Sequence, residues 1–141
     1  ASPLQMAMVA AGIANDGELM EPYLTRSVRA ANLQTVWSHK DTPMSTPMTR
    51  KSAKQLQEMM VSVVNNGTGR NARISGVTVG GKTGTAQTSP DKPPYAWFVG
   101  WSDKPKVAVA VFVESSNTER SEIAGGRLGA PIARDVIEAL R

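Results

Sequence analysis

The sequence predicts an α+β fold in which helices pack on one antiparallel sheet. Apolar residues recur at helical spacing near both ends of the chain and again just before residue 66. Three stretches rich in β-branched residues follow one another at roughly 78–87, 95–102 and 106–114. Because short connections separate these stretches, we expect three consecutive strands to run antiparallel.

The first helix is expected over residues 3–15. Pro3 suits the first helical position, and the turn-forming sequence NDG closes the apolar pattern. The next part of the chain is rich in β-branched and aromatic residues at 22–30 and 33–37, on either side of Ala31-Asn32. This pattern predicts a hairpin that projects to one side, and its role cannot be read from the sequence.

A second helix is expected to open at Thr46-Pro47 and to end at Asn65-Asn66-Gly67, whose residues tolerate the left-handed conformation. Its apolar stripe contains two methionines and is typical of a core-facing helix rather than a cofactor site. A terminal helix follows, with Pro131 near its first turn.

The last predicted strand, VAVAVFVE, is apolar on both faces. Such a strand is expected to lie inside a sheet that helices cover. Asp103-Lys104-Pro105 supplies the turn that precedes it.

Composition narrows the classes of function. The chain has 141 residues, of which 40% are apolar, enough to fill the core of one domain or of part of one. It has no cysteine and a single histidine, His39, which excludes thiolate nucleophiles and multi-histidine metal sites and disfavours a Ser-His-Asp triad. We expect His39 in a surface turn, and neither a metal nor another cofactor. The 16 basic and 12 acidic residues are interspersed, so no nucleic-acid partner is expected.

The segment GVTVGGKTGTAQ at residues 76–87 fits two incompatible patterns. Gly76, Gly81, Lys82 and Thr83 formally complete the G-x-x-x-x-G-K-[ST] phosphate-binding loop. That loop requires a helix beginning at its lysine, whereas GTAQTSP is a poor helix start and VTV favours a strand. We therefore interpret the segment as a strand.

As a strand, the segment places Lys82 and Gly84 on one side and Thr83 and Thr85 on the other. Gly84 leaves no side chain between the backbone and a ligand. A peptide could add to such an exposed edge as an extra strand, while a cation and flanking hydroxyls receive its terminal carboxylate.

Six segments resemble, in the same order, the C-terminal part of penicillin-binding protein transpeptidase domains. They are SPLQMAMVAAGIANDGELMEPYL, the helix before NNGTGRNA, GGKTGTAQ, AWFVGW, VAVAVFVE and GGRLGAPIARDVIEAL. The resemblance covers essentially the whole chain and is greatest to class B, monofunctional enzymes of the penicillin-binding protein A type. It implies a beta-lactamase/transpeptidase-like fold whose sheet has five strands, three of them from this chain.

The resemblance implies a peptidoglycan D,D-transpeptidase at the extracytoplasmic face of the bacterial cell membrane, anchored by an upstream segment. Such enzymes acylate a serine with the D-alanyl-D-alanine end of a stem peptide, expel D-alanine and pass the acyl group to an amine. Beta-lactams mimic the stem peptide and trap the serine. The chemistry needs three motifs, S-x-x-K, S-x-N and K-T-G, of which only K-T-G stands in its proper context here.

By that match, Lys82 attracts the substrate carboxylate and polarises the proton-relaying serine. Thr83 and Thr85 donate hydroxyl hydrogen bonds to the same carboxylate, and Gly84 keeps the strand surface clear. The backbone N–H of Thr85 supplies half of the oxyanion hole. The resemblance therefore implies Lys82 and Thr85 as catalytic and all four residues as substrate-binding.

Two further matches to the family's motifs are interpreted as decoys. Ser89-Pro90-Asp91-Lys92 fits S-x-x-K, but Pro93 and Pro94 disfavour the helical turn that a nucleophile and its lysine need. Ser115-Ser116-Asn117 fits S-x-N but follows the last strand, where these residues usually form a loop. We therefore expect residues 1–141 to be the C-terminal portion of one transpeptidase domain, completed by upstream chain that carries both motifs.

Two alternatives stay open on sequence grounds. A non-catalytic module that binds beta-lactams or stem peptides would use the same strand. In an ordinary α+β domain, Lys82 would be a solvated strand lysine, because short motifs also match by chance.

Overall fold

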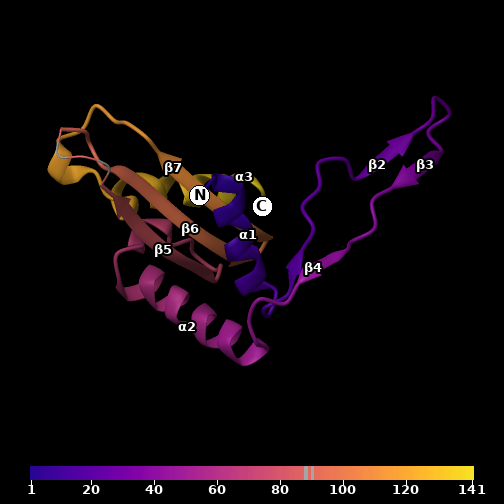
Figure 1. Ribbon diagram of the computed structural model, residues 1–141, viewed down its shortest axis with the longest axis horizontal. Helices are drawn as coiled ribbons and strands as arrows, with labels where there is room; N and C mark the ends of the chain where they lie inside the picture. The colour runs from indigo at the N-terminus through magenta and orange to yellow at the C-terminus, as the bar shows by residue number, and fades with distance from the viewer. Residues whose placement is uncertain (88, 90) are drawn as a thin grey trace.

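The computed structural model describes residues 1–87, 89 and 91–141 and shows one antiparallel sheet packed between helices (Figure 1). The sheet has the order β5-β6-β7 and consists of Val79–Ala86, Tyr95–Asp103 and Lys106–Val113. Helix α1 contacts β6 and β7, α2 contacts β5, and α3 contacts β6 and β7. The α+β class and the three antiparallel strands predicted from the sequence are confirmed.

Helix α1, Pro3–Ala14, begins as the sequence predicts because Ser2 caps it. The Gln5 N–H donates to Ser2 Oγ at 3.2 Å, and the Ser2 N–H donates to Gln5 Oε1 at 2.8 Å. This reciprocal pair satisfies amide groups that the first helical turn leaves unbonded.

Helix α2, Arg50–Asn66, begins later than predicted, since Thr49 rather than Thr46 is its cap. The Ser52 N–H donates to Thr49 Oγ1 at 3.1 Å. The start is displaced because Pro43–Ser45 forms β4, which pairs with β1 at Leu19–Met20, so the chain must first leave this pairing. The short β1–β4 pair was not predicted from the sequence.

The end of α2 also differs from the expectation. Gly67 adopts φ −108°, so no left-handed residue ends this helix. A Cβ added at Gly67 would lie 3.0 Å from backbone atoms of Val63. This close approach of the backbone accounts for a glycine at position 67.

The predicted hairpin exists and extends as an arm away from the sheet (Figure 1). Its strands β2 and β3, Ser27–Arg29 and Thr35–Ser38, are shorter than expected and solvent-exposed. His39 lies on this arm and stacks on Tyr23 with 3.8 Å between ring centroids. The histidine is thus part of the arm and not of the sheet.

The main core lies between the sheet and α3, Ala130–Ala139. Phe98 and Ile137 are fully buried at its centre, together with Val64 of α2. A smaller cluster on the opposite side joins Ile13, Met60 and Trp101. The connections to α3 and β5 also contain short helices, which are η1 at Arg70–Ala72, η2 at Arg120–Glu122 and the π-helix η3 at Gly125–Gly129.

Strand β7 lies at one edge of the sheet among the described residues, whereas its sequence predicted an interior position. Both of its faces are nevertheless approached by helices, α1 on one side and α3 on the other, which accounts for the apolar residues on both faces. No helix within the described part of the chain is long and apolar enough to cross a membrane.

Candidate functional site

The segment GVTVGGKTGTAQ forms strand β5 and not a phosphate-binding loop. Residues Val79–Ala86 pair with β6 without a bulge, so Lys82 lies within a strand and begins no helix. A phosphate-binding loop needs the helix N-terminus that is missing at this point. The strand interpretation is therefore confirmed.

Glycines allow two aromatic residues of β6 to cover β5 from opposite faces. A Cβ added at Gly80 would lie 2.4 Å from the Trp101 ring, and one at Gly81 would lie 2.3 Å from the Phe98 ring. Because successive side chains alternate, Lys82 lies on the Trp101 side with α1, and Thr83 lies on the Phe98 side with η3. Lys82 and Thr83 therefore lie on opposite faces of β5.

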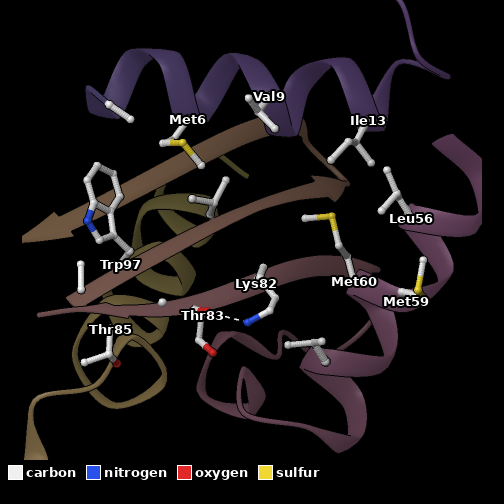
Figure 2. A pocket seen from close by; sticks show the side chains of 15 residues that line it. Met6, Val9, Ile13, Leu56, Met59, Met60, Lys82, Thr83, Thr85 and Trp97 are labelled. Atoms are coloured by element: carbon white, nitrogen blue, oxygen red, sulfur yellow. Dashed lines mark hydrogen bonds between the residues drawn. The ribbon is translucent and has the colours of Figure 1, made fainter. Parts of the chain in front are cut away.

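Lys82 folds back over the outer edge of β5. Its ammonium donates to the Thr83 carbonyl at 2.7 Å, a contact drawn in Figure 2. Because the Thr83 carbonyl accepts this bond, it points away from β6. The backbone N–H and C=O groups of every second residue in a strand point to the same side. The Thr85 N–H is therefore directed to the free edge as well.

Thr83 is held between the end of α2 and η3. Its Oγ1 lies 2.7 Å from Thr68 Oγ1, within hydrogen-bonding distance. Its methyl group faces Gly126, where an added Cβ would lie 3.5 Å from Thr83 Cγ2. The Thr83 hydroxyl oxygen therefore lies beside the residue that follows α2, and its methyl group lies on the η3 side.

The π-helix η3 packs its backbone directly against β5. A Cβ at Gly125 would lie 1.9 Å from the Trp97 carbonyl oxygen and 2.9 Å from the Gly84 nitrogen. The Asn71 side chain donates to the Gly126 carbonyl at 2.8 Å and ties η1 to the same turn. No sequence pattern indicates that Thr68 and Asn71 contact this site, whereas the pair Gly125-Gly126 is a signal of close approach that could have been used.

The four predicted residues line one cavity of about 830 Å³ beside β5 (Figure 2). The rest of its lining is mainly apolar and comes from α1, α2 and β6, including Met6, Val9, Ile13, Leu56, Met59, Met60, Val63, Trp97 and Val99. Thr85 also borders a second hollow, whose lining includes Glu119, Arg120 and Ser121. One cation, two hydroxyls and an open backbone edge beside such a cavity suit an extended peptide with a terminal carboxylate.

The described residues of the two decoy motifs lie outside regular helices and strands. The Lys92 N–H approaches the Ser89 carbonyl at 3.4 Å in a turn, and Pro90 between them lies outside the described residues. Ser115 and Asn117 follow the end of β7 in irregular structure. Within the described residues no cluster of His, Asp or Glu could hold a metal ion.

Residues 1–138 match the family described as the penicillin binding protein transpeptidase domain. The chain therefore belongs to this family. It is 39% identical to the peptidoglycan D,D-transpeptidase PbpA of Mycolicibacterium smegmatis, over 98% of this chain and 29% of that protein. It thus spans less than a third of that relative.

Solved structures agree with this assignment. Penicillin-binding protein A of M. tuberculosis, determined as a ceftriaxone acyl-enzyme complex, superimposes with a TM-score of 0.87 and 37% identity, covering 97% of this chain and 32% of that chain. The D,D-transpeptidase domain of a peptidoglycan glycosyltransferase from Eggerthella lenta gives a TM-score of 0.80 with 34% identity, covering 97% and 32%. The beta-lactamase/transpeptidase-like fold inferred from the sequence is confirmed.

Proposed function

We propose that this chain supplies the substrate-binding edge of a peptidoglycan D,D-transpeptidase. The observation that carries the proposal is the position of Lys82, whose ammonium reaches the outer edge of β5 beside the cavity. In this reading Lys82 attracts the carboxylate of a D-alanyl-D-alanine stem peptide, or of a beta-lactam that mimics it. The hydroxyl groups of Thr83 and Thr85 donate hydrogen bonds to the same carboxylate, and Gly84 leaves room for the ligand.

The Thr85 N–H provides one half of an oxyanion hole in this proposal. It is directed to the free edge, where it can bind the oxygen that becomes negative as a serine attacks the carbonyl of the substrate. A single such donor typically contributes on the order of 3 kcal/mol to stabilisation of the transition state. The second donor is the amide of the nucleophile itself, which lies in another part of the protein.

The nucleophile and the proton-relaying serine belong to a further part of the same domain that carries S-x-x-K and S-x-N. Two features of the chain suit such a part. The cavity wall includes exposed apolar side chains, with Val9 48% and Met59 57% exposed, which a helical segment would cover. The outer edge of β7 has no strand beside it among the described residues, and two more strands would complete the five-stranded sheet there.

The assembled enzyme would act at the extracytoplasmic face of the bacterial cell membrane, where its peptidoglycan substrate lies. Its anchor would be a segment outside residues 1–141. No metal or other cofactor is needed, since serine acylation requires only proton transfer and a stabilised oxyanion.

The test is Lys82→Ala in the longer protein that carries the complete domain. We expect the second-order rate of acylation by a fluorescent penicillin to fall about 100-fold, because the ligand loses a charge-assisted contact and the proton relay loses its cation. The melting temperature should change little, since Lys82 is exposed. Lys51→Ala, on the exposed face of α2, is the matched control and should label at the normal rate.

A second variant tests where the nucleophile lies. Ser89→Ala should leave labelling unchanged if the attacking serine belongs to the other part of the domain. Loss of labelling in Ser89→Ala would place the nucleophile in this chain, and normal labelling of Lys82→Ala would remove β5 from the site.

A further inference from the structure

The geometry points to Thr68 as a positioning residue that sets the direction of the Thr83 hydroxyl toward the substrate carboxylate. The inference rests on the proposed function, because it needs Thr83 to bind that carboxylate. Thr68 lies 15 residues before Thr83 in the chain, yet their Oγ1 atoms are 2.7 Å apart.

The backbone holds Thr68 in place before any ligand arrives. The N–H groups of Gly67 and Gly69, on either side of Thr68, both donate to the Val63 carbonyl at 3.0 Å. The Thr68 carbonyl in turn abuts η3, since a Cβ added at Gly126 would lie 2.1 Å from its oxygen. Thr68 is therefore fixed between the end of α2 and the π-helix.

The number of available hydrogens decides the direction of the bond. Each hydroxyl has one hydrogen to donate and can also accept, so the pair shares one hydrogen and leaves the other free. A carboxylate accepts only. When a carboxylate lies against Thr83, Thr83 must donate to it, and Thr68 must then be the donor within the pair.

Thr68 is the hydroxyl that lies within hydrogen-bonding distance of Thr83 Oγ1, while the Thr83 methyl group lies on the side of Gly126, which has no side chain. A hydroxyl that accepts one hydrogen bond while donating another is also polarised, which strengthens the bond that it donates. Removal of the Thr68 hydroxyl should thus weaken carboxylate binding while β5, α2 and η3 keep their positions.

The experiment compares two ligands that differ only in the carboxylate, benzylpenicillin and its methyl ester, on the longer protein. Thr68→Val keeps the shape of the side chain and removes the hydroxyl, whereas Thr68→Ser keeps the hydroxyl. Thr25→Val, on the exposed arm, is the matched control. Noncovalent affinity and the rate of the acylation step are measured separately for each ligand.

For Thr68→Val we expect about 10-fold weaker noncovalent affinity for benzylpenicillin, the effect of one lost hydrogen bond. Affinity for the methyl ester should stay within about twofold of the starting value, as the ester carries no carboxylate. Thr68→Ser should bind both ligands normally, and Thr25→Val should change neither.

An equal loss for both ligands with a lower melting temperature would mean that Thr68 only supports the fold, and the inference would be wrong. It would also be wrong if Thr68→Val bound both ligands normally while Lys82→Ala still lost acylation; the proposed function would survive that result. Normal acylation of Lys82→Ala by benzylpenicillin would instead overturn the carboxylate site and the role of Thr68 together.

Discussion

The contact between η3 and β5 predicts a large effect from one added methyl group, in Gly125→Ala. The new Cβ would lie 1.9 Å from the Trp97 carbonyl oxygen, 2.8 Å from the Gly84 oxygen and 2.9 Å from the Gly84 nitrogen. All three are backbone atoms, so no side chain can rotate out of the way. To reach a distance of 3.0 Å, the turn and the strand must separate by about 1.1 Å.

Such a separation carries two costs. Overpacking of this kind typically lowers the free energy of unfolding by about 1–3 kcal/mol, and we expect the upper end because the neighbouring atoms are backbone. The shift also moves η3 away from Thr83, whose methyl group faces Gly126. A displacement of about 1 Å in a reacting site can reduce the rate by about 100-fold, so acylation by benzylpenicillin should fall more than stability alone explains.

We would measure denaturant unfolding and the acylation rate of Gly125→Ala in the complete transpeptidase domain. Gly76→Ala is the control, because Gly76 has φ +74° and no atom within 4 Å of an added Cβ. That variant should lose about 1 kcal/mol through backbone strain and acylate normally. The reasoning is refuted if Gly125→Ala is no less stable than Gly76→Ala and acylates at the normal rate.

Two further predictions concern the core and the α1–α2 junction. Phe98→Ala should lower the free energy of unfolding by about 3–5 kcal/mol, since the ring is fully buried, whereas Phe112→Ala, at a site 36% exposed, should lower it by less than half as much; equal losses would contradict this account. Lys54, 2.7 Å from Asp16, and Gln57 hold the pKa of the Asp16 carboxyl below its usual 3.8. The stability that Asp16 contributes is therefore present above the unfolded-state pKa and lost as pH falls through the lower folded-state value. The difference in urea midpoint between the unmodified protein and Asp16→Asn should shrink from pH 7 to pH 3, and an unchanged difference would refute the assignment.

The sheet and the first helix could be predicted because their signals are local. Residues 106–113 have alternating β-branched residues directly after a turn sequence, and Ser2-Pro3 contains the cap and the first turn of α1. The start of α2 could not be placed because the β1–β4 pairing depends on residues more than 20 positions apart. Propensity is a weak guide where tertiary pairing decides an element boundary.

Part of the candidate site could likewise be predicted from the sequence, and part could not. The position of Lys82, Thr83, Gly84 and Thr85 on one strand follows from the sequence, because strand alternation is a local rule. The contact with Thr68 could not be predicted, and Gly125-Gly126 indicates a close approach without showing its partner, since both contacts depend on how α2 and η3 fold back onto β5. Gly125–Gly129 also has the composition of a loop, and it forms a π-helix where it packs against β5 and β6.

The glycines of β5 connect the fold to the proposed chemistry. Glycine inside a strand weakens it, because it costs more backbone entropy and has no side chain to pack. Here the space at Gly80 and Gly81 is filled by Trp101 and Phe98, so β5 stays fixed although its own side chains contribute little to the core. The same lack of side chains continues at Gly84, where η3 supports the strand from one face and the cavity opens beside it. A rigid edge without bulky side chains is what an added peptide strand requires, and neighbouring aromatic residues provide that rigidity without blocking the edge.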